Sequence, residues 1–329
     1  MTFQFVSGES GRALGQTDIR ISPVAMGCWP IAGMTSLDVN DADSRRTLRA
    51  AFESGVNFFD TAYCYGAAGE SERLIGSELA DCRDELVIAT KGGLHWDDNV
   101  ERRFDASPAS LRRECEESLR RLNTDRVELL YLHAPDPQVA VAESAGELKR
   151  LLDEGKARSI GASNFNVDQL DLFRAECPLA AVQPPFNMLQ READVDVLPW
   201  CERNGASAVI YWPLMKGLLA GKLPRDHQFQ SGDGRAKYPM FQGEEWHKNQ
   251  DFLDDLRSIA QRAGRSVAQL VVNWTIHQPQ ITAALCGAKR PYQIEEAAGA
   301  MGWSLSATEL AAIDEALARR GAVVTKGAV

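Results

Sequence analysis

Short runs of apolar residues recur along the chain, and longer amphipathic stretches separate them. Eight of these runs are rich in β-branched or aliphatic residues, and most are continuous rather than alternating. Continuous apolar runs are typical of parallel strands whose two faces are both covered. We therefore predict eight strands, at residues 23–29, 57–62, 86–91, 127–133, 157–163, 180–186, 207–212 and 281–288.

Signals for helix starts and ends fall between these strands. Ser107 is a favourable N-cap residue, Pro108 suits the first helical position, and apolar residues then recur every three or four positions. Capping-box pairs predict two further helix starts, and glycines predict two helix ends. These residues are Ser266 with Gln269, Ser306 with Glu309, and the glycines Gly264 and Gly321.

The order of these elements predicts the fold class. Eight strands that alternate with about eight helices over roughly 290 residues are typical of an α/β protein of the (β/α)8 TIM-barrel type. We expect one such domain over residues 1–329, with a small N-terminal β-hairpin at Thr17–Ser22 and a long loop, 214–248, after the seventh strand. An open doubly wound sheet is the alternative, but the chain has no G-x-G-x-x-G fingerprint.

Composition narrows the class of partner. The chain has 36 Lys and Arg against 46 Asp and Glu, and this net charge of −10 argues against nucleic acid or an anionic membrane as a partner. No run of 18 apolar residues occurs, so we expect no membrane span. No signal peptide is evident, and seven scattered cysteines without C-x-x-C argue against a disulfide framework or a metal site. We expect a cytoplasmic protein.

Four polar residues stand at or after the ends of neighbouring predicted strands. Asp60 ends the second strand, Lys91 the third and His133 the fourth, and Tyr65 lies in the loop after the second. In a barrel, the carboxyl ends of the strands carry the chemistry. A lysine beside a tyrosine favours the phenolate, an aspartate holds the lysine, and a histidine orients a substrate oxygen. The set suits proton delivery to a carbonyl oxygen, with hydride from a nicotinamide.

Seven stretches of the chain resemble the aldo-keto reductases, in the order that this family has them. The resemblance covers about Arg12 to Leu317 and is greatest to the bacterial general-stress and inositol-operon branch. The stretches are GVNFFDTAYCYG (55–66), ESERLIG (70–76), LVIATK (86–91), SLRRLNTDRVELLYLH (118–133), GKARSIGASNF (155–165), YWPLMKGLLAGK (211–222) and GAKRPYQIEE (287–296).

The resemblance implies a role for each matched position. Tyr65 falls on the proton donor, Lys91 and Asp60 on its partners, and His133 on the residue that orients the substrate. The cofactor positions comprise a nicotinamide group, a loop over the pyrophosphate and an adenosine group. They are Ser163, Asn164, Gln183 and Tyr211; then Trp212, Pro213, Leu214, Gly217 and Lys222; and Gly287, Lys289, Gln293 and Glu296.

The adenosine end favours NADPH over NADH. Lys289 and Arg290 precede a helix that Pro291 is expected to open, and two cations at a helix N-terminus suit a 2′-phosphate. The chain departs from the family at Trp212, where a small residue such as Ser is frequent, and at Ala297, where Asn is common.

Aromatic residues near strand ends are candidates for the substrate pocket. Trp29 and Trp96 are the two that we expect to contact substrate, together with His133. Cys64 lies between two tyrosines, either as a packing residue or as an oxidisable thiol.

The resemblance implies an NADPH-dependent enzyme that reduces an aldehyde or ketone, or that oxidises a sugar or alcohol in reverse. The alternative is a cofactor-bound regulatory module with slow turnover, like the potassium-channel β subunits. The expected partner is a small carbonyl or sugar substrate. Neither the identity of that substrate nor the oligomeric state follows from the sequence.

Overall fold

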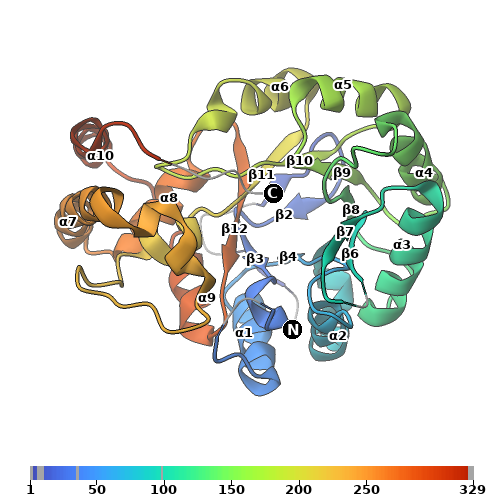
Figure 1. The fold of residues 1–329 in the computed structure, drawn as a ribbon, viewed down its shortest axis with the longest axis horizontal. Helices are drawn as coiled ribbons and strands as arrows, with labels where there is room; N and C mark the ends of the chain where they lie inside the picture. Colours follow the sequence, from blue (N-terminus) through green and yellow to red (C-terminus); the bar gives the residue numbers. More distant parts are fainter. Residues whose placement is uncertain (1–2, 6–10, 35–36, 98, 325–329) are drawn as a thin grey trace.

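The computed structural model describes residues 3–5, 11–34, 37–97 and 99–324. Eight parallel strands close into a barrel, so the predicted fold class is confirmed (Figure 1). Around the ring, the strands are ordered β10-β11-β12-β3-β4-β5-β8-β9. Their bounds are β3 Val24–Gly27, β4 Phe58–Asp60, β5 Val87–Gly92, β8 Leu129–Leu132, β9 Ile160–Ser163, β10 Ala181–Gln183, β11 Ser207–Tyr211 and β12 Ile281–Gly287. Each lies within or overlaps a predicted strand.

Ten α-helices occur in the described part of the chain, against about eight predicted, and two of them, α7 and α10, pack on each other outside the ring (Figure 1). The predicted caps are confirmed at Ser107, Ser266 and Ser306, whose side chains each accept a hydrogen bond from a backbone N–H of the first turn. The helices are α1 Asp41–Glu53, α2 Glu70–Glu78, α3 Pro108–Leu122, α4 Val141–Asp153, α5 Val167–Glu176, α6 Val197–Asn204, α7 Gly243–Ala263, α8 Val267–Ile276, α9 Pro291–Ala298 and α10 Ala307–Arg320.

The core has an inner and an outer layer, as the pleat of a barrel strand requires. Phe58 on β4 belongs to the buried cluster inside the barrel, while its neighbour Phe59 belongs to the cluster between strands and helices. Leu129 and Leu130 on β8 divide in the same way. Continuous apolar runs in the sequence follow from this arrangement, because both faces of each strand are buried.

Two antiparallel hairpins accompany the barrel. The N-terminal hairpin pairs β1 (Arg12–Ala13) with β2 (Arg20–Ile21), so it starts before the predicted Thr17–Ser22 segment. Its apolar residues join the inner core cluster and close the barrel floor. The second hairpin was not predicted: it pairs β6 (Leu94–Trp96) with β7 (Arg102–Phe104), directly after β5.

The long loop after β11 is shorter than predicted. Helix α7 already begins at Gly243, and short 3₁₀ turns occupy part of the preceding segment: η4 Met215–Ala220, η5 Gly234–Lys237 and η6 Pro239–Phe241.

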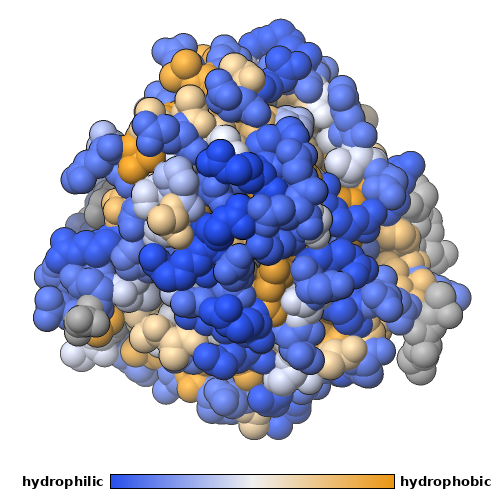
Figure 2. All heavy atoms as spheres, turned by 90° about the vertical axis from the view of Figure 1, so that its right-hand side faces the viewer, coloured by the Kyte–Doolittle hydropathy of each residue, from blue (hydrophilic) through white to orange (hydrophobic). Residues whose placement is uncertain are grey.

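The face that carries α3 and α4 is largely hydrophilic, as solvent-facing helix sides should be (Figure 2). In the ranges that the structure describes, no helix combines the length and apolar character needed to cross a bilayer.

Candidate active site

Asp60, Lys91 and His133 lie at the carboxyl ends of β4, β5 and β8, which are neighbours in the barrel. Lys91 Nζ donates hydrogen bonds to Asp60 Oδ1 at 2.5 Å and to the carbonyl oxygen of Thr61 at 2.8 Å. The same ammonium lies 3.4 Å from Tyr65 Oη. The structure therefore brings the predicted lysine, aspartate and tyrosine into one hydrogen-bonded chain. The Thr61 carbonyl is a member of this chain that the sequence did not single out.

The electrostatics of this chain differ from the simplest expectation. Burial and the Asp60 carboxylate raise the pKa of Tyr65 well above its ordinary value. Lys91 by itself would lower that pKa, as we expected, but Asp60 lies 2.5 Å from its ammonium and offsets the charge. The pKa of Tyr65 is thus raised overall, whereas the lysine alone would lower it. Tyr65 is a protonated phenol, which is the form that an acid must have.

His133 faces the same tyrosine. The two ring centroids are 5.9 Å apart in an edge-to-face arrangement. Burial is the main reason why the pKa of His133 lies well below its ordinary value, and the charges of Lys91 and Arg102 lower it further. The imidazole is therefore neutral, with one N–H to donate and one nitrogen to accept.

Cys64 completes the neighbourhood of His133. Its Sγ lies 3.6 Å from Nδ1 of the imidazole and only 2% of the residue is exposed. Burial raises the pKa of Cys64 to about 12. A thiol with such a pKa carries almost no thiolate at neutral pH, so Cys64 has the properties of a packing residue rather than of a reactive thiol.

The predicted nicotinamide residues form a second chain, which meets the first at two points. Gln183 Nε2 donates to Asp60 Oδ2 at 2.9 Å, and Asn164 Nδ2 donates to the carbonyl oxygen of His133 at 2.9 Å. Tyr211 Oη donates to Asn164 Oδ1 at 2.7 Å, and Ser163 Oγ donates to the Gln183 carbonyl oxygen at 3.1 Å. These residues lie on or directly after β9, β10 and β11, which follow β8 around the ring.

The loop predicted to cover the pyrophosphate has unusual backbone geometry. Trp212 has a φ of 61° and Gly217 a φ of 90°. A Cβ on Gly217 would have only one atom within 4 Å, Arg235 Nη1 at 3.7 Å, so this stretch of backbone is open to a ligand. Pro213 is buried and Leu214 packs against the core, which anchors the start of the loop.

The predicted adenosine residues lie around the start of α9. Gln293 Oε1 accepts from the backbone N–H of Lys289 at 2.9 Å, and Glu296 forms an ion pair of 2.5 Å with Lys222. Lys289 Nζ donates to the Leu37 carbonyl oxygen at 2.8 Å. Gly287, at the end of β12, is exposed beside this group. The ion pair joins the pyrophosphate loop to the adenosine group.

A second cation lies beside Lys289. Arg290 donates to the carbonyl oxygen of Asp38 at 2.7 Å and forms an ion pair of 3.2 Å with Asp43. Both cations therefore already hold the segment that leads into α1, and a bound phosphate would compete with or join these contacts.

Both tryptophans expected in the substrate pocket adjoin Tyr65. The Trp29 ring centroid is 5.0 Å from that of Tyr65, in an edge-to-face arrangement. Trp96 donates its indole N–H to the carbonyl oxygen of Cys64 at 2.7 Å. Trp96 and Tyr65 also pack on the same small buried cluster. The structure thus brings together a proton-bearing tyrosine, a neutral histidine and two aromatic walls.

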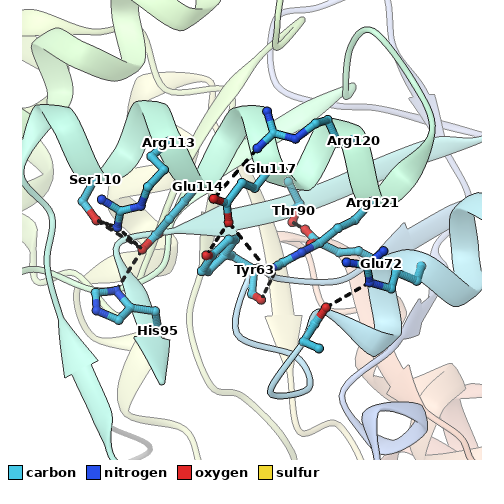
Figure 3. A network of polar contacts seen from close by, with 12 residues as sticks. Tyr63, Glu72, Thr90, His95, Ser110, Arg113, Glu114, Glu117, Arg120 and Arg121 are labelled. Carbon is cyan, nitrogen blue, oxygen red and sulfur yellow. Dashed lines mark hydrogen bonds and ion pairs between the residues drawn. The ribbon is translucent and has the colours of Figure 1, made fainter. Parts of the chain in front are cut away.

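A polar network behind the barrel holds the loop that carries Tyr65 (Figure 3). Tyr63 points outward and donates to Glu117 Oε2 on α3 at 2.6 Å. Arg121 donates to the carbonyl oxygen of Tyr63 at 3.1 Å and pairs with the buried Glu72 at 3.1 Å. Glu72 accepts in turn from Thr90 at 2.6 Å. No pattern in the sequence indicated this network, although the E-S-E-R and S-L-R-R stretches carry two of its members.

Known proteins match this chain over most of its length. The Aldo/keto reductase family profile matches residues 23–318. The chain is 37% identical over 300 residues to Aldo-keto reductase YhdN of Bacillus subtilis (strain 168), covering 90% of each chain. It is 32% identical over 325 residues to the NADH-specific methylglyoxal reductase of Escherichia coli (strain K12), covering 93% of this chain and 98% of that protein. The glycerol dehydrogenase AKR11B4 from Gluconobacter oxydans is similar in structure, with a TM-score of 0.89, 37% identity and coverage of 98% of this chain and 99% of the other.

Proposed function

The chain belongs to the aldo/keto reductase family, and from that premise we propose that it is an NADPH-dependent oxidoreductase. Its reaction is the reduction of an aldehyde or ketone to an alcohol, or the reverse oxidation of a sugar or alcohol. The observation that supports it best is the chain from Asp60 through Lys91 to Tyr65, with spacings of 2.5 and 3.4 Å. A structural ion pair alone does not require a phenol at its end.

Tyr65 is the proposed proton donor to the carbonyl oxygen. Its raised pKa keeps the phenol protonated at neutral pH, so the proton is present when negative charge develops on the substrate. Lys91 lies beside the phenol oxygen and stabilises the tyrosinate that remains after transfer. Asp60 and the Thr61 carbonyl fix the position of that ammonium. Lys91 therefore contributes most after the proton has left.

His133 is the proposed orienting group for the substrate oxygen. As a neutral imidazole it donates one hydrogen bond without adding a charge that would compete for the proton of Tyr65. Trp29 and Trp96 supply apolar walls beside Tyr65, which exclude water from the place where proton transfer occurs. Their positions favour substrates with an apolar or planar part next to the carbonyl.

The residues around the barrel mouth fit a nicotinamide cofactor. A bound nicotinamide supplies the hydride, which no side chain can donate. Ser163, Asn164 and Gln183 present amide and hydroxyl groups suited to a carboxamide, and Tyr211 presents a ring suited to stacking. Because Gln183 and Asn164 also bond to Asp60 and the His133 carbonyl, the cofactor floor and the proton-transfer group are positioned together.

Lys289 and Arg290 favour NADPH as that cofactor. Both cations lie at the start of α9, and Lys289 has no carboxylate partner among the described residues. The Escherichia coli relative is named NADH-specific, so family membership alone leaves the choice of cofactor open. The proposal of NADPH rests on these two cations.

The test is cofactor oxidation by the purified protein across a panel of aldehydes, ketones and sugars, run in both directions with NADPH and NADH. Turnover of 4-nitrobenzaldehyde with NADPH, lost in the Tyr65→Phe variant, is the expected result. Tight cofactor binding with no appreciable turnover on any member of the panel would instead indicate a regulatory module and overturn the proposal.

A further inference from the structure

Arg102 lies on the hairpin that follows β5, on the side of that hairpin which faces the candidate active site. In the β6–β7 pairing, Arg102 is directly opposite Trp96. Residues directly opposite each other in an antiparallel pair project from the same face. Trp96 on that face bonds to the Cys64 carbonyl oxygen at 2.7 Å and packs on the same cluster as Tyr65. The Arg102 side chain therefore rises beside the indole at the mouth of the barrel.

The charge of Arg102 is not neutralised within the described part of the chain. Its neighbour Arg103 pairs with Asp97 at 2.8 Å and with Glu101 at 2.6 Å. The side chain of Arg102 is exposed and forms no hydrogen bond or ion pair to any described residue. The field of this guanidinium nevertheless reaches the site, since it contributes to the low pKa of His133. An exposed cation is thus directed at the site, and none of the described residues neutralises it.

The position of the hairpin separates Arg102 from the proposed cofactor loop. β5, which leads into the hairpin, and β11, which leads into the 212–222 loop, are four places apart in the ring of eight strands. Strands four places apart lie on opposite sides of such a barrel (Figure 1). The phosphates of a cofactor under the 212–222 loop would therefore lie across the mouth of the barrel from Arg102, which favours the substrate as the anion that approaches it.

We propose that Arg102 forms an anion subsite, which binds a carboxylate or phosphate group on the substrate while the carbonyl group contacts Tyr65 and His133. This inference rests on the proposed function and names the substrate class: aldehydes or ketones that carry an anionic group. A guanidinium holds either anion through paired N–H donors. Trp29 and Trp96 then contact the part of the substrate between its two ends.

The kinetic test compares two aldehydes of similar shape that differ in charge, 4-carboxybenzaldehyde and 4-nitrobenzaldehyde. For the unaltered protein we expect the higher kcat/KM with the carboxylate, and we expect this preference to shrink as salt is added. Arg102→Gln should lower kcat/KM for the carboxylate about tenfold and leave that for the nitro compound unchanged. Glyceraldehyde 3-phosphate and glyceraldehyde provide the same comparison for a phosphate. A fall in kcat/KM of Arg102→Gln that is confined to either anionic substrate supports the subsite.

Arg20→Gln is the matched control. Arg20 is also an exposed arginine on a short hairpin strand, and its side chain forms no hydrogen bond or ion pair to any described residue, but it lies at the barrel floor. The two variants change the net charge equally, so a general charge effect would appear in both. The proposal is overturned if Arg102→Gln leaves the ratio of anionic to neutral kcat/KM unchanged for both pairs, or if Arg20→Gln changes it as much.

A binding measurement separates this inference from the proposed function. Calorimetric titration of the cofactor-loaded protein with benzoate and with the neutral benzamide needs no turnover. Benzoate binding that is weakened in Arg102→Gln and kept in Arg20→Gln supports the subsite even if every aldehyde is inert. Turnover of 4-nitrobenzaldehyde together with equal benzoate affinity in all three proteins overturns the subsite alone.

Discussion

Gln183 Nε2 donates a hydrogen bond of 2.9 Å to Asp60 Oδ2, while Lys91 holds the other oxygen of the same carboxylate at 2.5 Å. One buried carboxylate thus joins β10, a strand of the proposed cofactor side, to the proton-transfer group on β4 and β5. Burial raises the pKa of Asp60, and its bonds to Lys91 and Gln183 oppose that rise. The carboxylate depends on both partners to stay ionised.

Gln183→Leu should therefore reduce stability as well as cofactor binding. The substitution leaves a buried carboxylate oxygen without its donor, at a cost of about 1–3 kcal/mol in the free energy of unfolding. Urea unfolding measures this cost. Gln278→Leu is the control, because the side chain of that half-buried glutamine bonds, among the described residues, only to the Trp274 carbonyl oxygen of the preceding helix α8, and its loss should cost less than about 1 kcal/mol. Equal costs in the two variants would contradict the role of Gln183 in holding Asp60.

Tyr65→Phe should reduce carbonyl reduction by about 10²–10⁴-fold, the usual size of general acid catalysis. The ring remains, so the dissociation constant of the cofactor should stay nearly the same. Tyr63→Phe is the matched control: Tyr63 lies two residues away and donates its hydroxyl proton to Glu117 behind the barrel. Steady-state kinetics with a neutral aldehyde decide the matter. A Tyr65→Phe variant with more than about a tenth of the original kcat would show that another group donates the proton.

Lys91→Met separates a role in proton transfer from a purely structural ion pair. Removing a positive charge 3.4 Å from the phenol oxygen disfavours the tyrosinate, so the pKa of Tyr65 should rise further. Alcohol oxidation needs Tyr65 as a base, so the limb of the oxidation pH–rate profile that reports the ionisation of Tyr65 should move to higher pH. The measurement is the oxidation rate against pH, corrected for the folded fraction. An unmoved limb would leave Lys91 with a structural role only.

The stability of this variant needs its own control, because Asp60 loses its buried partner. Breaking a buried pair from one side costs about 3–5 kcal/mol. The double variant Lys91→Met/Asp60→Asn removes both charges and should recover part of that stability in thermal unfolding. It should not recover oxidation activity, since the positive charge beside Tyr65 is still missing.

The pH dependence of reduction follows from the pKa shifts of Tyr65 and His133. Tyr65 must be protonated for reduction, and its pKa lies well above 10, so it stays protonated as the pH rises toward that value. His133 is neutral, because its pKa lies well below 6.5. Reduction should thus change little between roughly pH 7 and 9, whereas oxidation should rise about tenfold per pH unit. Profiles of kcat in both directions check this. A reduction limb near pH 7 would show that a group other than these two controls proton transfer.

Lys289→Met tests the choice of cofactor. If Lys289 binds the 2′-phosphate, the substitution should weaken NADPH binding by about tenfold and leave NADH binding unchanged. Fluorescence titration with both cofactors measures the two dissociation constants. Lys248→Met, on an exposed part of α7 where the lysine pairs with Glu244, controls for the change in net charge. Equal affinities for the two cofactors in the unaltered protein would refute the assignment.

The sequence by itself determined the barrel and indicated most of the residues of the candidate site. Parallel strands buried on both faces appear as continuous apolar runs, so all eight could be placed, and local caps such as Ser107 and Ser306 set helix starts. The D-T-A-Y-C-Y-G and V-I-A-T-K stretches mark the residues at two strand ends, and their family match indicated Tyr65, Lys91 and Asp60. These features depend on neighbouring residues in the chain, which a sequence displays directly.

Only the tertiary structure decided how these groups affect one another. The hairpin of β6 and β7 is too short and too polar to stand out as a pattern, and its register alone shows that Arg102 is opposite Trp96. Whether the pKa of Tyr65 is raised or lowered depends on burial and on how close Asp60 comes to Lys91. Coulomb energies vary with distance and with the solvent that the fold excludes, and both are set by contacts between residues far apart in the chain.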